Sequence, residues 1–306
     1  MALAAMRLLP LTLELGGADA AIIRHDADIG RAASGIVWAG FSNAGQSCAG
    51  VQRVLVHEAV YKSFMEELRR NVEALRPGDG PSCDLGPMIS LKQKNIVRKQ
   101  IQECLAGGAQ IAAQSRPFTA SDGKAKGGLD DDSLWAPAIV LCGVKAGMPI
   151  MDEEVFGPVI GVLAVADDDE ALAIANSSRY GLTASVWSRD RREAMRLAAM
   201  MNAGSIMIND HLMSHGLAEA PWGGFGDSGL GKTHGEAGFK EMLKTIVIVD
   251  ELLPAAKRNP WWQPYSRKVF LGLAAFGDFL GGPGFIKRLK AVPRLVAFFL
   301  RSWGKG

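Results

Sequence analysis

A cysteine surrounded by small residues carries the strongest chemical signal in this sequence of 306 residues. Cys48 follows the run Phe-Ser-Asn-Ala-Gly-Gln-Ser at 41–47 and precedes Ala49 and Gly50. A thiol reacts near neutral pH once it is exposed and its pKa is lowered a little. Small neighbours leave room for a carbonyl carbon to reach the sulfur and for backbone N–H groups to point at an oxyanion. These features predict that Cys48 is a nucleophile.

Glu14 is the candidate base, and a motif rather than the residue alone supports it. It lies in Leu-Glu-Leu-Gly-Gly at 13–17, and Glu-Glu-Val-Phe-Gly-Pro follows at 153–158. An isolated glutamate would be a solvated carboxylate at a strand end, and an isolated cysteine would be a buried small hydrophobe. Together with the segment that ends at Cys48, the three blocks resemble the aldehyde dehydrogenase superfamily over about residues 8–250.

This resemblance implies a reaction. The Cys48 thiolate would attack an aldehyde, the adduct would pass a hydride to NAD or NADP, and Glu14 would activate the water that hydrolyses the thioester. The product would be a carboxylic acid, so the implied enzyme is an NAD(P)-dependent aldehyde dehydrogenase that acts on a small aldehyde.

Four positions resemble the family's cofactor site. Glu154 would hold the nicotinamide ribose, Phe156 would pack beside the ring, and Leu15 and Gly16 would lie next to both. For Phe156 the alternative is core packing. Ala18 departs from the family, which often has a lysine there, so the detail of this loop stays open.

Three further polar residues are candidates for roles near the thiol, at the substrate or in a turn. Glu236, in His-Gly-Glu-Ala-Gly at 234–238, resembles a family glutamate that relays protons near the thiol, or it is a surface acid. Asn209 resembles a family asparagine on the substrate side. Asn43 is expected to cap a turn.

The position of the first motif predicts the domain organisation. In the family, the segment that resembles residues 8–14 follows most of a nucleotide-binding domain, and no dinucleotide-binding unit lies upstream of Glu14 here. We therefore expect residues 1–15 to be a remnant of a cofactor-binding domain and residues 16–238 to be a catalytic domain. The alternative function is a truncated, impaired fragment with at most residual esterase activity or an assembly role.

The fold class follows from the alternation of the elements. The composition is globular, with 48% hydrophobic and 22% charged residues. Strand-like and helix-like patterns alternate, which predicts an α/β fold, and the resemblance implies an open twisted sheet flanked by helices. The predicted strands are 53–56, 138–141, 159–165, 183–187 and 205–208, the predicted helices are 58–76, 90–105, 169–177 and 191–201, and 114–133 is expected to be a surface loop or hairpin.

Residues 239–250 are expected to contain an oligomerisation strand. Thr245 to Val249 is a β-forming run that is apolar on both faces, and it resembles the strand that family members pair with another subunit. A homo-oligomer is therefore predicted, because an exposed edge of this kind would otherwise aggregate.

Residues 251–306 form a C-terminal segment of different character. They contain ten Lys or Arg against two acids and ten of the 22 aromatic residues. No apolar run reaches the roughly 18 residues that span a bilayer. Two interpretations stay open: peripheral contact with a membrane, and a helix packed on the protein itself or on a partner subunit.

Several other site types are not expected. Residues 226–233 match a phosphate-loop pattern, but Pro221 and Gly223 precede them where a strand is needed, and Gly235 and Gly238 follow where a helix is needed. His211 and His215 are four apart but have no acid between them and fall in an expected loop, and the four cysteines are too widely spaced for a metal site. No nucleic-acid partner is predicted. Unpaired cysteines suit the reducing cytoplasm.

Overall fold

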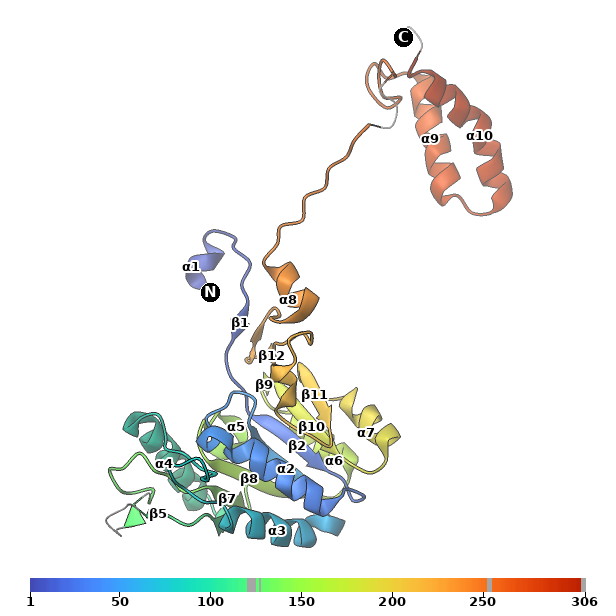
Figure 1. The fold of residues 1–306 in the computed structure, drawn as a ribbon. Helices are drawn as coiled ribbons and strands as arrows, with labels where there is room; N and C mark the ends of the chain where they lie inside the picture. Colours follow the sequence, from blue (N-terminus) through green and yellow to red (C-terminus); the bar gives the residue numbers. More distant parts are fainter. Residues whose placement is uncertain (120–124, 127, 252–254, 304–306) are drawn as a thin grey trace. The chain divides into compact units, whose positions relative to one another are not determined.

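A computed structural model of the chain describes residues 1–119, 125–126, 128–251 and 255–303 (Figure 1). The chain divides into two compact units, Met1–Lys244 and Thr245–Gly306, which we call the body and the tail. Each unit has its own hydrophobic core. The expected boundaries after residues 15, 238 and 250 do not coincide with this division at 244.

A seven-stranded sheet forms the centre of the body, in the order β11-β10-β2-β3-β8-β7-β4. All neighbouring strands are parallel except β4, which pairs antiparallel with β7 at one edge. The strands are β2 (Asp19–Ile23), β3 (Val51–His57), β4 (Gln110–Gln114), β7 (Ile139–Cys142), β8 (Val159–Val165), β10 (Thr183–Trp187) and β11 (Ser205–Ile208).

Helices cover both faces of this sheet because successive side chains of its strands point to opposite faces. In β2, Ala21 and Ile23 belong to the core cluster beneath α2 (Ile29–Phe41) and α3 (Glu58–Glu73). Ala20 and Ile22 belong to the opposite cluster, beneath α6 (Asp168–Asn176) and α7 (Arg191–Ala198). The predicted α/β fold with an open sheet between helices is confirmed (Figure 1).

Local signals set both ends of three strands correctly, and 205–208 is one of them. The predicted strands 159–165 and 183–187 have the observed bounds. Ser90 caps α4 (Leu91–Ala106) by accepting a hydrogen bond from the Gln93 N–H, and Gly107 ends it. The predicted helix 58–76 is shorter, since α3 ends at Glu73. Short helices also occur at α1 (Ala2–Ala5), α5 (Pro149–Asp152), η1 (Ser42–Gly45) and η2 (Met213–Gly216).

Short strand pairs lie outside the main sheet. β1 (Leu13–Glu14) pairs with β13 (Gly229–Leu230), and β9 (Tyr180–Gly181) pairs with β12 (Phe225–Gly226). Within the predicted hairpin 114–133, β5 (Phe118–Thr119) pairs with β6 (Ala125–Lys126). Residues 120–124 and 127 of that prediction lie outside the described residues.

The predicted strand within 239–250 is not formed in this chain. Residues 235–241 form helix α8 (Gly235–Glu241), and residues 243–251 have no regular secondary structure. The side chains of residues 246–249 are exposed. A β-forming run becomes a strand only when a partner completes its hydrogen bonds, and none of the described strands pairs with this run.

The tail contains a helical hairpin, α9 (Arg267–Gly281) and α10 (Phe285–Leu300). Val269, Gly272 and Ala275 form the buried stripe of α9, and Ala291, Leu295 and Phe298 form that of α10. A Cβ atom on Gly272 would lie 2.3 Å from the Phe298 ring, so the helices pack closely there. Among the described residues, no helix has both the length and the hydropathy that a membrane span requires.

Candidate active site

The three motifs meet at the edge of the sheet where its parallel strands begin. Glu14 and Gly16 precede β2, Cys48 precedes β3, and Glu154 and Phe156 precede β8. β3 lies between β2 and β8, and all three strands are parallel. Their amino ends therefore share one edge, and the chain brings together segments that are more than a hundred residues apart in sequence.

The backbone before Cys48 is held in an unusual conformation. Asn43, Ala44 and Gly45 have φ values of 53°, 55° and 66°, in the left-handed region. A Cβ atom on Gly45 would lie 2.1 Å from the Gly157 carbonyl oxygen, so the loop approaches the 153–158 segment directly. Backbone strain of this kind costs about 1–3 kcal/mol per residue and concentrates at functional sites.

Two side-chain amides hold this loop in place. The Asn43 Nδ2 group donates to the Gln46 carbonyl at 2.9 Å, and Gln46 Nε2 donates to the Asn43 carbonyl at 2.9 Å. Gln46 Oε1 also accepts from the Ile89 N–H at 2.7 Å. The expected turn-capping role of Asn43 is confirmed, and Gln46 anchors the loop to the chain before α4.

Glu154 reaches across to the first motif. Its Oε1 accepts a hydrogen bond from the Gly17 N–H at 3.2 Å, and a Cβ atom on Gly16 would lie 2.4 Å from its Oε2. Burial raises the pKa of the Glu154 carboxyl, and the Gly17 N–H opposes that rise. The family glycines are thus needed to admit this carboxylate, which is half-buried beside them.

Glu14 is clamped by two groups that the sequence did not point to. Its Oε2 accepts from the Trp222 indole N–H at 2.9 Å, and its Oε1 accepts from the Thr233 hydroxyl at 2.9 Å. Trp222 and Thr233 are themselves joined by a pair of 2.7 Å backbone hydrogen bonds. Each carboxylate oxygen therefore has a fixed partner, and the carboxylate orientation is set by residues more than 200 positions away.

The electrostatics around Cys48 differ from the expected lowering of the thiol pKa. Partial burial raises the pKa of the Cys48 thiol, and the negative charges of Asp19, Glu14 and Glu154 raise it further. The nearby carboxylate charges thus act against the lowered pKa that would favour a thiolate.

Phe156 and Leu15 lie at the surface of the site rather than in the core. The Phe156 ring is exposed and its φ is 53°, so the alternative of plain core packing does not apply. Leu15 is also an exposed apolar side chain. Two exposed apolar groups next to a half-buried carboxylate are suited to contact a flat ring and its sugar.

The structure does not bring Glu236 or Asn209 to Cys48. Glu236 is exposed on α8 and forms a 2.7 Å ion pair with Lys240 of the same helix. Asn209 follows β11, and its amide donates to and accepts from the backbone of Ser188, which follows β10. Asn209 and Ser188 lie at the carboxyl ends of two parallel strands, so Asn209 lies at the opposite edge of the sheet from Cys48.

The glycine-rich segment 226–233 is not a phosphate loop. It contains β13, which pairs with β1 and so supports the strand that carries Glu14. It also ends at Thr233, a Glu14 partner. In a phosphate loop the strand precedes the pattern and the helix opens at its last residues, whereas here β13 lies inside the pattern and α8 begins only at Gly235.

Comparison with known proteins gives consistent matches. The sequence profile of the aldehyde dehydrogenase family matches residues 1–248. A 4,4'-diapolycopene aldehyde oxidase of Methylomonas sp. is 35% identical over 281 residues, which cover 91% of this chain and 50% of the relative. That match extends well beyond residue 248 into the tail.

Two further relatives have named cofactors. A succinate-semialdehyde dehydrogenase [NADP(+)] 1 of Mycobacterium tuberculosis is 35% identical, over 81% of this chain and 52% of the relative. A betaine aldehyde dehydrogenase of Staphylococcus aureus, solved in complex with NAD+, superposes with a TM-score of 0.72 at 33% identity, over 78% of this chain and 46% of that one. The chain spans about half the length of the relatives it matches. It belongs to the aldehyde dehydrogenase family.

Proposed function

We propose that this chain carries the catalytic thiol of an enzyme that oxidises an aldehyde to a carboxylic acid. The observation that supports this best is the convergence of Glu14, Cys48 and Glu154 at one sheet edge, around a strained loop. A thiol with a plain structural role needs neither the left-handed backbone before it nor three carboxylates beside it.

In this proposal Cys48 Sγ adds to the aldehyde carbon and forms a thiohemiacetal. Loss of a hydride from that carbon gives a thioester, and water then cleaves the carbon–sulfur bond, which returns the thiol and releases the acid. Glu14 takes the proton from that water, and Trp222 and Thr233 keep its carboxylate oriented. Such a general base contributes about 10²- to 10⁴-fold to the rate.

NAD or NADP would supply the hydride acceptor for this oxidation when bound. The residues present suit such a group: Glu154 offers a half-buried carboxylate that can accept ribose hydroxyl hydrogen bonds, and Phe156 and Leu15 offer exposed apolar surface. Gly16 leaves the backbone open beside them. Glu236 retains a proposed proton-relay role only if α8 moves, whereas Asn209 is fully engaged elsewhere and we propose no substrate contact for it.

Trapping of the acyl-enzyme tests these roles. An activated ester acylates the thiol without a cofactor, so intact-mass measurement follows acylation and deacylation separately. We expect Glu14→Gln to acylate normally and to deacylate at least 100-fold more slowly. Cys48→Ala should not acylate, while Cys83→Ala, a matched change at another half-buried cysteine, should behave as the unsubstituted chain does. Normal acylation of Cys48→Ala would contradict the proposal.

Two alternatives to the dehydrogenase are candidates. One is a residual esterase activity, and the other is a role in assembly without catalysis. Both would need only residues that the structure describes: ester hydrolysis would use Cys48 and Glu14, and assembly would use the exposed run Thr245–Val249. Calorimetric titration with NAD and NADP, followed by absorbance at the reduced-nicotinamide band with an aldehyde present, separates these from the dehydrogenase. Ester turnover without cofactor binding favours the esterase, and aldehyde-dependent reduction rules it out as the main activity.

Assembly is proposed through the run Thr245–Val249. Its exposed apolar side chains and unpaired backbone would be satisfied by a strand of a second subunit. Proline at Val247 removes a ladder donor, so Val247→Pro should lower the mass measured by sedimentation if the run pairs between copies. Lys244→Pro, just outside the run, is the control, and an equal effect of both would contradict the proposal.

For the tail, we propose peripheral contact with an anionic membrane, on a protein of the cytoplasm. Phe285, Leu289, Val296 and Leu300 recur at helical spacing on α10, opposite its buried stripe, and all are exposed. At helical spacing, Lys290 lies to one side of this outer stripe and Arg288 to the other. Apolar side chains bordered by cations fit an anionic headgroup boundary better than they fit water.

A further inference from the structure

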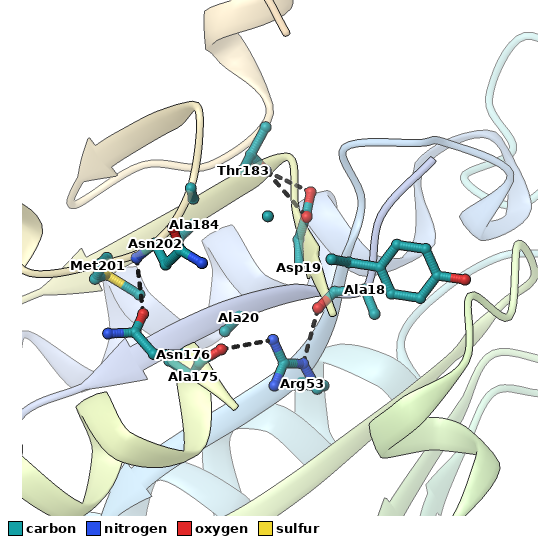
Figure 2. A pocket seen from close by; sticks show the side chains of 13 residues that line it. Ala18, Asp19, Ala20, Arg53, Ala175, Asn176, Thr183, Ala184, Met201 and Asn202 are labelled. Carbon is teal, nitrogen blue, oxygen red and sulfur yellow. Dashed lines mark hydrogen bonds between the residues drawn. The ribbon is translucent and has the colours of Figure 1, made fainter. Parts of the chain in front are cut away.

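A chain of buried polar side chains begins directly behind the Cys48 loop. Asp19, the first residue of β2, is only 2% exposed. The Thr183 N–H and hydroxyl donate to its carboxylate at 3.0 and 2.5 Å (Figure 2). The same hydroxyl lies 3.2 Å from Nε2 of His211, whose Nδ1 lies 2.8 Å from the Ser185 hydroxyl. Side chains from β2, β10 and the segment after β11 thus form one continuous chain.

The order of donors in this chain ends at Asp19. The Trp187 indole N–H can only donate, and it donates to Ser185 Oγ at 3.0 Å. One proton order that satisfies these contacts has Ser185 donate to His211 Nδ1, which places the imidazole proton on Nε2, facing Thr183 and the Ala49 carbonyl. The Thr183 proton is left for Asp19. The ionised carboxylate, which only accepts, completes this order, so the charge of Asp19 and the orientation of Thr183 and His211 depend on one another.

Asp19 is also close to the backbone of the nucleophile. A Cβ atom on Gly17 would lie 2.7 Å from Asp19 Oδ1 and 2.9 Å from the Cys48 carbonyl oxygen, so only a glycine separates the two. Thr183 Oγ1 lies 3.5 Å from the carbonyl oxygen of Ala49. The chain therefore contacts the residue that follows the thiol and approaches the thiol's own peptide group.

The surroundings of Asp19 are closely packed and carry charges of both signs. The cavity beside it in Figure 2 measures about 10 Å³, which admits at most a water-sized group. Arg53 is the cation that acts on Asp19, and its guanidinium is bound to the carbonyls of Ala18, Ile174 and Ala175 rather than to the carboxylate. The negative charge of Glu154 contributes to the raised pKa of Asp19, and the charges of Glu14 and Glu154 contribute to the raised pKa of the Cys48 thiol.

We propose that Asp19, held by the Thr183–His211–Ser185 chain, is a positioning residue of the Cys48 loop whose negative charge opposes ionisation of the Cys48 thiol. It is a pH-dependent restraint, because burial raises the pKa of Asp19 to about 7, against the hydrogen bonds from Thr183. At pH 6 Asp19 is mostly neutral and the restraint is absent, and at pH 8.5 it is fully charged. The inference rests on the proposed role of Cys48 as the nucleophile.

Thiol alkylation as a function of pH tests this without any cofactor. Limiting iodoacetamide and mass spectrometry give the rate at Cys48 between pH 6 and pH 8.5. For Asp19→Asn we expect a rate equal to that of the unsubstituted chain at pH 6 and about three- to tenfold higher at pH 8.5. Asp130→Asn removes an exposed carboxylate from the same unit. The ratio of its Cys48 alkylation rate to that of the unsubstituted chain should stay near one at every pH.

A ratio for Asp19→Asn that does not grow with pH would overturn the proposal, since a purely structural effect would act at every pH. Thr183→Val and Thr183→Ser provide a second test if Asp19→Asn does not fold. The valine removes the donor that favours the charged carboxylate and should reproduce the rise at pH 8.5, whereas the serine keeps the hydroxyl and should not. Identical profiles for these two variants would equally overturn it.

The outcome for the unsubstituted chain separates this proposal from the proposed function. If Cys83, Cys104 or Cys142 is alkylated before Cys48, the assignment of the nucleophile fails. If Cys48 is alkylated first and the Asp19→Asn ratio stays flat, only the role of Asp19 fails.

Discussion

The body and the tail are both rich in apolar residues, but they bury them differently. In the body, β2 places alternate residues into two separate cores, and helices cover both faces of the sheet. In the tail, α9 and α10 bury one stripe each against the other, and their outer stripes are exposed. The body therefore covers both faces of its sheet, whereas each tail helix covers only one of its two apolar stripes.

The largest effect we expect compares two phenylalanines. Phe64 on α3 is fully buried in the body, and Phe285 on α10 is 78% exposed. Phe64→Ala should lower the free energy of unfolding by about 3–5 kcal/mol, because it removes the ring's burial and leaves a cavity. Phe285→Ala should change it by less than about 0.5 kcal/mol. Urea unfolding of the two variants measures this, and a loss for Phe285→Ala comparable to that for Phe64→Ala would mean that the tail is packed on the protein after all.

The sequence predicted the parts of this molecule that depend on neighbouring residues. Strand β8 was correctly bounded because an apolar β-branched run follows Pro158, and α4 because Ser90 caps it. The thiol loop and its glycines were recognised from motifs whose residues are adjacent. Such signals are local, and the fold class needs little more than their order.

Contacts between distant segments were not predictable in this way. The partners of Glu14, Trp222 and Thr233, depend on how β13 pairs with β1, which no local pattern specifies. Asp19 and His211 were missed because a buried polar chain has no periodicity. For Asn209 a signal did exist: it follows a parallel strand whereas Cys48 precedes one, and these positions belong to opposite edges.

A second prediction concerns the pH dependence of body stability. The folded-state pKa of Asp19 is raised to about 7, so its contribution is present below its unfolded pKa near 4 and is lost as pH rises to 7. Burial lowers the pKa of His211 to about 4, so its contribution is present above its unfolded pKa near 6.5 and is lost as pH falls to 4. The two slopes oppose each other between pH 4 and pH 6.5.

Substituting either Asp19 or His211 should reveal the pH dependence that the other residue gives to the free energy of unfolding. Relative to the unsubstituted chain, Asp19→Asn should gain about 3 kcal/mol of stability from pH 4 to pH 6.5, and His211→Gln should lose about 3 kcal/mol over the same range. Urea unfolding at a series of pH values measures both. Slopes of the same sign in the two variants would contradict the buried chain, and neither change should alter hydrogen exchange in the tail.

A third prediction separates the two sides of one tail helix. Leu295 is 8% exposed on the inner stripe of α10, and Leu289 is 57% exposed on its outer stripe. Leu295→Ala should destabilise the hairpin by about 2 kcal/mol, which corresponds to about 30-fold faster amide exchange in α9 and α10. Leu289→Ala should leave exchange within about twofold. Equal protection in both variants would mean that the hairpin is not held together by its inner stripe.

The smallest effect tests what the outer stripe contacts. Lys290 lies next to Leu289 and forms no ion pair among the residues that the structure describes, so its charge is available to a lipid headgroup. A basic residue at an anionic surface contributes about 1 kcal/mol, so Lys290→Gln should weaken binding to phosphatidylserine-containing vesicles about fivefold. Lys62→Gln, an exposed lysine on α3 of the body, is the matched control and should bind as the unsubstituted chain does.

Salt and apolar substitution then distinguish the two contributions to that binding. Added salt should weaken the electrostatic part of the binding, but some binding should persist at high salt because burial of the outer stripe is not screened. Leu289→Ser should abolish this salt-resistant binding without changing the salt dependence. If the unsubstituted chain stays in the soluble fraction at low salt on anionic vesicles, the membrane proposal is wrong. A mass that falls toward the monomer for Leu289→Ser would then assign the outer stripe to a second copy of the chain, and the tail, like the body, would bury its apolar residues against protein.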